Sequence, residues 1–393
     1  MRENLASRFS TSTTLTQAGR FITALAHSSD GSLWIAAEEH GVSRLQKDTL
    51  IVFEAGSALA DESPLCLTVD AEGVLWAGNR TQGVSRLLGK SWQHAGVRHG
   101  LGGTWVADIA VDPAANAVWC TTENGISRYD GRRWHTFHPR NGLPFRETAA
   151  VAVGPGGRVW AGGATGGIAF FEEGEWATVP WPVAAGTETP PSSEWLVNDV
   201  HVSSTGTVRA AACSGIYTAR PQEREWLHHA PAQMTEGITE NAVACIAELP
   251  GGTILLGTRK HGILVLDANG NFRRRVDKSD GLADTFVSAI LAPSDTTIFV
   301  GTYGYGLTVF GELPDDINFR TAQSGKDTRE HIPHRVTSAP APPSTPAQAA
   351  SVTYLGEDRQ TQGNWIGNYG TYAYILPAMG MPVDCRGGPG LSS

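Results

Sequence analysis

The sequence predicts an all-β protein, a seven-bladed β-propeller made of four-stranded antiparallel blades. Three observations lead to this prediction: a short pattern recurs seven times, successive copies are about one blade apart, and each copy has the character of strands. The first copy is DGSLWIAAEEHGVSRL from Asp30, and EGVLWAGNRTQGVSRL follows from Glu72. Such self-similarity at a fixed period predicts one supersecondary unit repeated along the chain.

Each copy contains one anchor position, which holds a tryptophan in the first four copies. The seven equivalent anchors are Trp34, Trp76, Trp119, Trp160, Arg209, Leu255 and Phe299. Their spacings are 42, 43, 41, 49, 46 and 44 residues, a period that is typical of propeller blades and of some helical solenoids. We expect the recurrent tryptophans to be core residues between blades, because burying their large apolar surface stabilises the fold.

Four strands are predicted in each copy. An inner strand comes first, as in FITALAH, VADIAVD and VNDVHVS, where small and β-branched residues end at a turn signal. The anchor strand follows (SLWIAA), then a third strand after a glycine (GVSRL), then a fourth strand such as RRWHTF or GEWATV. Because no helical period separates these segments, the propeller is favoured over a helical solenoid.

A glycine ends the turn between the second and third strands in every copy. Glycine has no Cβ, so we expect it to adopt a positive φ or to let two backbones approach closely. These glycines are Gly41, Gly83, Gly125, Gly167, Gly215, Gly262 and Gly306.

The ring is predicted to close with an N-terminal strand. The last copy has three clear strands that end at Phe310, whereas SRFSTSTTL at residues 7–15 occupies the place of a fourth strand before the first inner strand. Pairing these two segments would hide the strand edges that a propeller must protect. The propeller is therefore predicted to span residues 1–314.

The remaining chain changes character. Residues 315–350 are rich in Pro, Ala, Ser and Thr and are predicted to be a flexible linker, in which His331 and His334 are a solvated pair rather than a metal site. Residues 351–393 are predicted to be a short or truncated C-terminal module, since so few residues give only a marginal core.

Composition excludes several classes of function. The net charge of −9 argues against nucleic acid as a partner, because nucleic-acid binding needs a concentrated basic face. The cysteines at 66, 120, 213, 245 and 385 are dispersed, which predicts buried or free thiols rather than disulfides or a zinc site. The chain has no apolar signal-peptide region and no run of about 18 apolar residues, so we expect no membrane insertion and, as written, a cytoplasmic location.

The copies resemble the two-component regulator propeller repeat. The segments NGLPFRETAAVAVGPGGRVWAGGATGGIAFF and DGSLWIAAEEHGVSRL carry this resemblance, which covers about residues 8–311 and is strongest in residues 21–180. It implies an extracytoplasmic sensor-type propeller that recognises polysaccharide fragments, and hence a periplasmic or extracellular location if a leader is missing. This chain departs from the sensor pattern because it has no membrane segment, kinase helix or ATP-binding motif. The segment YLGEDRQTQGNWIGNYGTYAYIL is similar to the start of a domain appended to bacterial surface and secreted proteins.

A ligand site is predicted where the second-to-third and fourth-to-first loops crowd one face around the central channel. Carboxylates on one side, bases on the opposite side and aromatic rings between them suit a polar ligand with many hydroxyl groups, such as an oligosaccharide. No cofactor and no metal are predicted. The candidate ligand-binding residues are Glu38, Glu39, Asn79, Arg80, Trp105, Glu123, Asn124, Arg146, Trp195, Asn198, Asn241, Arg259, Lys260, His261, Tyr303 and Tyr305.

Two other functions stay open beside non-enzymatic ligand recognition. A propeller lyase or hydrolase acting on a polysaccharide or cyclic peptide would use Glu38 and Glu123 as an acid/base pair, or His40 or His261 as a base. A protein-interaction scaffold would use the long insertion PWPVAAGTETPPSSEW, residues 180–195, as a docking loop.

Overall fold

The computed structural model describes most of the chain up to residue 322. The chain divides into two compact units, Met1–His334 with Pro377–Ser393, and Arg335–Leu376, and every described residue belongs to the first. The described residues are 9, 12–38, 40–47, 49–53, 64–164, 167–179, 196–212, 215–219, 226–229, 243–311 and 318–322.

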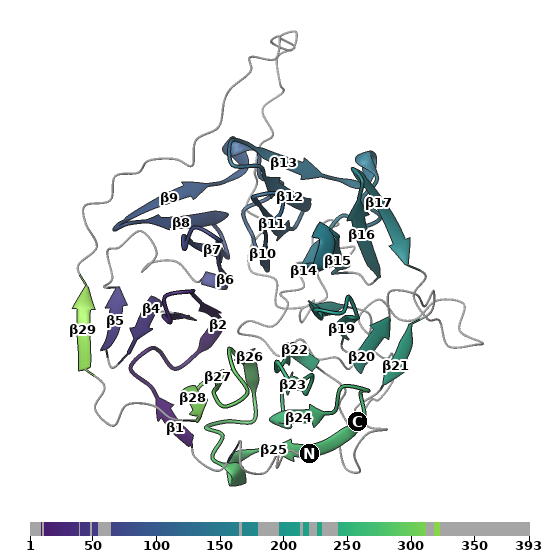
Figure 1. The fold of residues 1–393 in the computed structure, drawn as a ribbon. Coiled ribbons are helices and arrows are strands. Elements are labelled where there is room, and N and C mark those ends of the chain that lie inside the picture. Colours follow the sequence, from purple (N-terminus) through teal and green to yellow (C-terminus); the bar gives the residue numbers. More distant parts are fainter. Residues whose placement is uncertain are drawn as a thin grey trace, which may run out of the picture. The chain divides into compact units, whose positions relative to one another are not determined.

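Within these residues, seven four-stranded antiparallel blades surround a central axis (Figure 1). Blade 1 contains β2 (Ile22–His27), β3 (Leu33–Ala37), β4 (Gly41–Gln46) and β5 (Thr49–Phe53), and blade 2 contains β6 (Pro64–Val69), β7 (Leu75–Asn79), β8 (Val84–Leu88) and β9 (Ser91–Ala95). Blade 3 contains β10 (Ile109–Asp112), β11 (Ala117–Thr122), β12 (Gly125–Tyr129) and β13 (Trp134–Phe137), and blade 4 contains β14 (Thr148–Val153), β15 (Val159–Gly163), β16 (Ile168–Glu172) and β17 (Glu175–Val179).

The other three blades follow the same order. Blade 5 contains β18 (Val197–Val202), β19 (Val208–Ala212), β20 (Gly215–Ala219) and β21 (Leu227–His229), and blade 6 contains β22 (Val243–Glu248), β23 (Ile254–Thr258), β24 (Ile263–Leu266) and β25 (Phe272–Val276). Blade 7 contains β26 (Val287–Leu291), β27 (Ile298–Thr302), β28 (Gly306–Phe310) and the N-terminal β1 (Ser12–Leu15). The predicted fold class is therefore confirmed, blade by blade.

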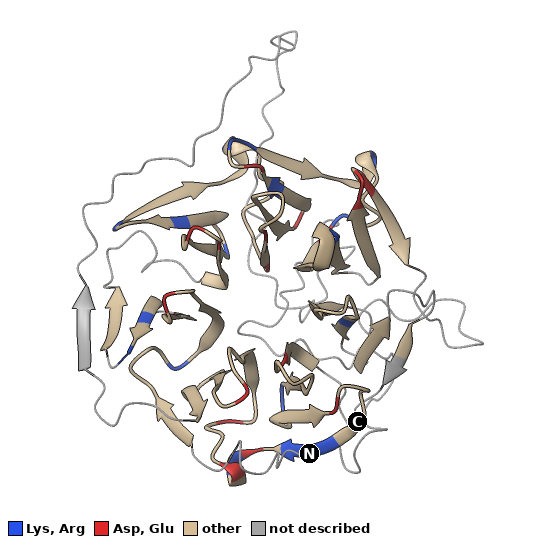
Figure 2. Ribbon diagram, in the orientation of Figure 1, with Lys and Arg blue, Asp and Glu red and all other residues tan. Residues whose placement is uncertain are grey.

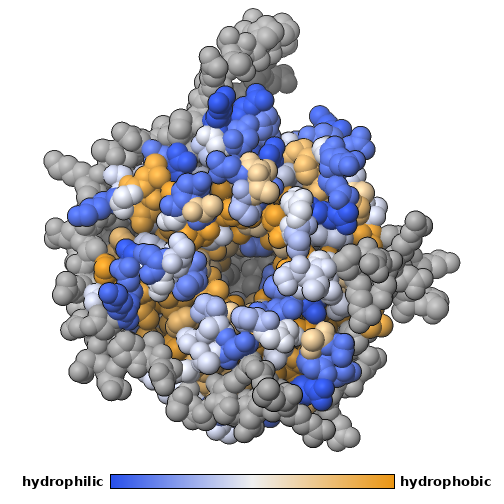
Figure 3. Space-filling model, in the orientation of Figure 1, coloured by the Kyte–Doolittle hydropathy of each residue, from blue (hydrophilic) through white to orange (hydrophobic). Residues whose placement is uncertain are grey.

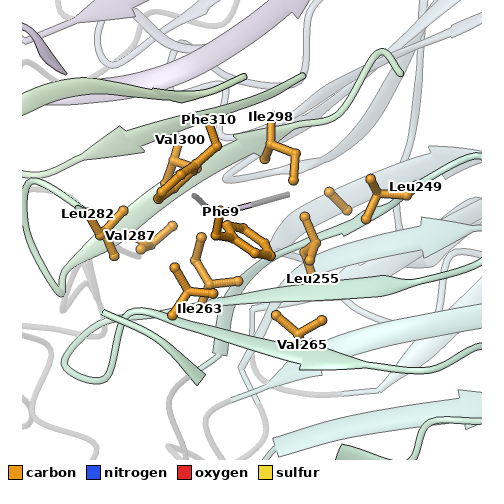
Figure 4. Packing of buried hydrophobic residues seen from close by; sticks show 12 residues of the cluster. Phe9, Leu249, Leu255, Ile263, Val265, Leu282, Val287, Ile298, Val300 and Phe310 are labelled. Carbon is orange, nitrogen blue, oxygen red and sulfur yellow. The ribbon is translucent and has the colours of Figure 1, made fainter. Parts of the chain in front are cut away.

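The N-terminus closes the ring as predicted. Strand β1 pairs antiparallel with β28, from Ser12 opposite Phe310 to Leu15 opposite Leu307. Phe9 lies in the apolar cluster between blades 6 and 7 (Figure 4), where its ring meets that of Phe310 edge-on with centroids 5.0 Å apart. The N-terminal segment therefore supplies both the last strand and a core side chain.

The anchors are buried between blades, which confirms their predicted role. Trp76 is 2% exposed and Trp119 is 1% exposed. Each anchor tryptophan of blades 1 to 3 lies opposite an arginine of the next strand, and the arginine carbon Cζ lies 5.2 to 5.6 Å from the ring centroid. The Ser-Arg of the repeat thus places a cation over the anchor ring, an arrangement that stabilises buried aromatic residues. The pairs are Trp34 with Arg44, Trp76 with Arg86, and Trp119 with Arg128.

Blade 5 replaces the tryptophan with Arg209. This side chain is buried, and its Nη1 lies 2.6 Å from Oε2 of Glu248, a residue of blade 6. Nε2 of His201 lies 3.3 Å from the same oxygen. These contacts lower the pKa of Glu248, through the hydrogen bond with His201 and the charge of Arg209. An ion pair therefore joins these two blades where an aromatic ring joins others.

The turn glycines satisfy both predicted reasons for their presence. Gly125 has a φ of 118°, and a Cβ there would lie 2.0 Å from the carbonyl oxygen of Phe137 in the fourth strand. Gly306 has a φ of 88°, and its Cβ would lie 2.5 Å from the carbonyl oxygen of Leu15. The second case shows that β1 takes the position that a fourth strand has in other blades.

A further strand extends blade 1. Strand β29 (Asn318–Ala322) pairs in parallel with β5, from Asn318 opposite Thr49 to Ala322 opposite Phe53. It falls within residues 315–350, the predicted linker, whereas the rest of that linker and residues 351–393 lie outside the described residues.

Three cysteines are described, and their thiols are free. Cys66 and Cys120 are buried and Cys245 is half-buried, in agreement with the prediction of core thiols. The cysteines at 213 and 385 lie outside the described residues.

Candidate functional site: the central cavity

A cavity of about 230 Å³ lies on the axis of the ring, lined by the inner strands and the residues just before them from all seven blades. Seen along the axis, the molecular surface is hollowed at its centre (Figure 3). A concave site lined mainly by apolar groups with a few polar ones is the usual form of a small-molecule site.

A repeated β-bulge shapes the lining. In six blades the register between the inner strand and its neighbour shifts at the same point, so that one inner residue has no direct partner. Such a bulge re-aims the side chain of the extra residue. All six extra residues line the cavity: Thr23, Leu65, Ala149, Asn198, Ala244 and Ser288.

The polar bulge residues bond to the next blade. Thr23 donates its hydroxyl to the carbonyl oxygen of Pro64 at 2.6 Å, and Ser288 donates to that of Ile22 at 2.6 Å. Asn198 donates through Nδ2 to the carbonyl oxygen of Val243 at 2.8 Å. Because both hydroxyl protons and one N–H of Asn198 are engaged in this way, most of the polar atoms still available on these three side chains are acceptors.

Two carboxyl groups lie one residue further along the inner strands. Asp108 accepts hydrogen bonds from the amides of Ile109 and Val151, both at 2.8 Å, and Asp199 accepts from the amide of Ile246 at 2.7 Å. Their exposed surface faces the cavity rather than bulk solvent. Burial, together with the negative charge of Asp199, raises the pKa of Asp108 to about 8. Burial also raises the pKa of Asp199.

These carboxyl groups predict a pH-dependent stability. Asp108 keeps its proton up to about pH 8 in the folded protein, but only to about its ordinary pKa of 3.8 when unfolded. The folded state thus binds more protons between these values, so we expect the free energy of unfolding to fall as pH rises from about 4 to 8. Asp199 acts in the same direction, whereas the nearby thiols of Cys66 and Cys245 stay neutral because burial raises their pKa.

Thermal unfolding at several pH values tests this expectation. Asp108→Asn should flatten the decline in melting temperature between pH 5 and pH 9, because the amide cannot ionise. Glu175→Gln, on the exposed side of β17, is the matched control and should leave the profile unchanged. Parallel profiles for Asp108→Asn and the wild type would contradict the argument.

Three residues predicted from the sequence come together at the cavity. Trp105 and Asn198 line it. Arg259 reaches Asn198, with its Nη2 3.5 Å from Oδ1. The structure therefore places an aromatic ring and an amide in the lining of the cavity, with a guanidinium group beside the amide.

Other predicted residues are engaged with one another. Glu38 accepts from Nη2 of Arg80 at 3.0 Å and from the hydroxyl of Tyr303, which links blades 1, 2 and 7. The Oδ1 atom of Asn124 accepts from Nε and Nη2 of Arg146 at 3.1 and 2.7 Å. Residues that the sequence analysis predicted to bind a ligand therefore form hydrogen bonds with one another.

Glu123 and Asn79 hold loops in place. The carboxylate of Glu123 accepts from the amides of Thr104 at 2.9 Å and Trp105 at 3.1 Å, so it positions the segment that carries Trp105. Asn79 is fully buried and donates through Nδ2 to the carbonyl oxygen of Gly83 at 3.2 Å. Their bonds give both residues a structural role at the ring face.

The remaining candidates are peripheral or not described. Lys260 and His40 are exposed and His261 is half-buried, and Tyr305 is 51% exposed with Nζ of Lys278 5.2 Å from its ring centroid. Glu39, Trp195 and Asn241 lie outside the described residues, as does the whole insertion at 180–195.

The sequence analysis missed four polar residues of the lining: Thr23, Asp108, Asp199 and Ser288. A signal for two of them is present. Asp108 directly precedes the inner strand β10 and Asp199 lies within β18, and a carboxyl group in or beside a strand that lines the core is rarely placed there without a partner.

Charge elsewhere is distributed around the ring (Figure 2). The most basic strand, β25, contains three arginines, each of which forms an ion pair with an aspartate near it in the sequence. Within the described residues, no three His, Cys, Asp or Glu side chains form a cluster suited to a metal ion. No helix of the described part is both long and apolar enough to cross a membrane.

Comparisons with known proteins place the fold. Neither a family model nor a curated protein sequence matches the chain. Among solved structures, the extracellular domain of BT4673, described as a hybrid two component system of B. thetaiotaomicron, aligns with 16% identity and a TM-score of 0.61. The alignment covers 76% of this chain and 39% of that one.

Two further structures have the same architecture. An inactive variant of virginiamycin B lyase from Staphylococcus aureus with quinupristin has 14% identity and a TM-score of 0.61, covering 76% of this chain and 97% of that one. YCF48 bound to D1 peptide has 13% identity and a TM-score of 0.56, covering 78% and 96%. The predicted resemblance to two-component propellers is thus confirmed for the fold, which a lyase and a peptide-binding protein share.

Proposed function

We propose that this chain is a non-enzymatic recognition propeller that binds a small polar ligand, such as a sugar or short oligosaccharide, at the central cavity. The observation that carries the proposal is a cavity of about 230 Å³ lined by Trp105 and Asn198, with Arg259 beside Asn198. An aromatic ring stacks on the apolar face of a sugar, while amide and guanidinium groups bond its hydroxyls.

The bonding of the other candidates supports binding more than catalysis. Glu38 and Glu123, the pair that a hydrolase would need, are held by Arg80, Tyr303 and backbone amides. A general acid or base must reach the reacting group, so a carboxylate fully engaged in structure is a weak candidate. The fold is shared with an extracellular domain of a two component system, which is consistent with recognition.

A thermal-shift screen of the purified full chain against neutral, amino and acidic saccharides tests the proposal. A saturable ligand stabilises the folded state by about 2.7 kcal/mol at a hundredfold excess over Kd. We expect Trp105→Ala and Arg259→Ala each to weaken binding at least tenfold, and Arg132→Ala, in an exposed turn, to leave it unchanged.

Each alternative function has its own result in the same experiment. If a product forms over hours and chelator abolishes its formation, the chain is a lyase rather than a binding protein. If the chain captures a protein, deletion of residues 183–193 abolishes this capture and no saccharide shifts the melting temperature, the chain is a scaffold. A saccharide shift that survives both cavity variants would place the site elsewhere.

A further inference from the structure

Hydrogen-bond acceptors outnumber donors among the polar side chains of the central cavity. Thr23, Asn198 and Ser288 direct their donor groups to backbone carbonyls of the next blade, at 2.6 to 2.8 Å. The lone pairs left on both hydroxyl groups and the Oδ1 atom of Asn198 can only accept, whereas the second N–H of Asn198 and the indole N–H of Trp105 can still donate. A ligand that brings several donors therefore finds most of its partners on the other polar side chains of the lining.

The charged side chains of the lining also favour a ligand that brings hydrogen-bond donors. Among the described residues that line the cavity, the charged ones are Asp108 and Asp199, with no Lys, Arg or His; the guanidinium group of Arg259 lies beside Asn198. The two carboxyl groups come from blades 3 and 5, and blade 4 contributes the small Ala149 to the lining. Burial, and then the negative charge of Asp199, raise the pKa of Asp108, and a cation that enters the cavity favours the ionised form of both carboxyl groups.

We propose that the cavity takes a ligand with a protonated primary amine, such as an amino sugar or a diamine, whose ammonium group lies on the Asp108 and Asp199 side. This inference rests on the proposed function, because it names the chemical class that the same site selects. An ammonium group supplies three donors to a lining of acceptors and carboxylates. Anionic ligands such as uronates would meet like charge and are disfavoured.

The carboxyl groups also have a structural use, and the test must separate the two roles. Asp108 and Asp199 accept backbone amide bonds from the next blade. Asparagine keeps an acceptor oxygen for those bonds while removing the negative charge. Asp108→Asn and Asp199→Asn therefore probe charge with little loss of the bonds between blades.

Isothermal titration of the full chain with three matched four-carbon probes tests the inference: putrescine, 1,4-butanediol and succinate. Alkyl ammonium groups stay protonated at pH 9, as that of lysine does. We expect putrescine to bind, each Asn variant to weaken it at least tenfold, and Glu175→Gln to leave it unchanged. The neutral and anionic probes should show no saturable heat.

A second measurement needs only the wild type. At pH 7 Asp108 holds a proton, so putrescine binding should release protons, measured as a dependence of the heat on the ionisation enthalpy of the buffer. Binding should tighten as pH rises from 6 to 9, because Asp108 loses its proton over this range. The neighbouring ionisable groups are Asp199 and, beside it, His201.

Three outcomes overturn the inference. The first is that butanediol or succinate binds as tightly as putrescine. The second is that putrescine binds the Asn variants as tightly as the wild type, and the third is that no probe binds. If a saccharide still shifts the melting temperature through Trp105 and Arg259, the proposed function stands without the amine preference. If the saccharide screen is also silent, both fail.

Discussion

Deletion of residues 1–16 is expected to abolish cooperative unfolding of the whole propeller. The deletion removes β1 and with it all four residue pairs to β28, which leaves a strand edge of blade 7 exposed. It also removes Phe9 from the cluster between blades 6 and 7. A Phe→Ala change in a core costs about 3–5 kcal/mol, against a total stability of about 5–15 kcal/mol. Circular dichroism during heating measures the loss.

Two matched variants make this result interpretable. Deletion of residues 1–8 leaves Phe9 and β1 in place and should preserve the melting temperature. Phe9→Ala in the full chain should give an intermediate loss of about 3–5 kcal/mol. A chain lacking residues 1–16 that melts like the wild type would mean that the ring does not depend on this closure.

The second large effect is expected for Trp119→Ala, with a loss of about 3–5 kcal/mol in the free energy of unfolding. Trp119 is 1% exposed and packs between blades 3 and 4, stacked on Phe137 with centroids 5.7 Å apart. Its removal leaves a large void that the ring packing cannot fill, and it also removes the surface beneath Arg128. Chemical denaturation followed by fluorescence of the remaining tryptophans measures the change.

Trp119→Phe is the control. The indole Nε1 of Trp119 has no hydrogen-bond partner among the described residues, so phenylalanine loses volume but no bond. We expect a much smaller loss than for alanine. Equal losses for the two variants would show that the indole itself, rather than the filled volume, is required.

The fold was predictable because each blade is local in sequence. The anchors, the turn glycines and the order of four strands recur within about 40 to 50 residues, so one pattern repeated seven times reveals the architecture. Closure by β1 followed from counting strands in the last copy. Strand β29 was not predictable, since a five-residue parallel strand in a polar segment has no alternating pattern of its own.

The site was predictable only in part, because its contacts cross the ring. Trp105 and Asn198, which line the cavity, and Arg259, which bonds to Asn198, were among the residues proposed from the sequence for ligand binding. The bond of Glu38 to Arg80 joins residues 42 apart, and that to Tyr303 joins residues 265 apart. Whether such side chains face a ligand or each other depends on the angle between blades, which no local pattern encodes. Asp108 and Asp199 were overlooked because the inner strands were interpreted only as short segments rich in β-branched or small residues.

The bonds between inner strands have a mechanical consequence. Side chains on these strands bond forward from blade 7 to 1, 1 to 2, 3 to 4 and 5 to 6, through Ser288, Thr23, Asp108 and Asn198. The other three junctions have Leu65, Ala149 and Ala244 at the bulge position. The junctions between blades therefore differ in stiffness. Stiff and compliant junctions alternate around the ring, and because seven is odd, blade 1 has a stiff junction on both sides. Of the three junctions with apolar bulge residues, that of blades 2 and 3 has only a weak bond from the Cys66 thiol to the carbonyl oxygen of Val106. We therefore expect breathing of the ring, and any widening of its bore as a ligand passes, to be largest at these three junctions.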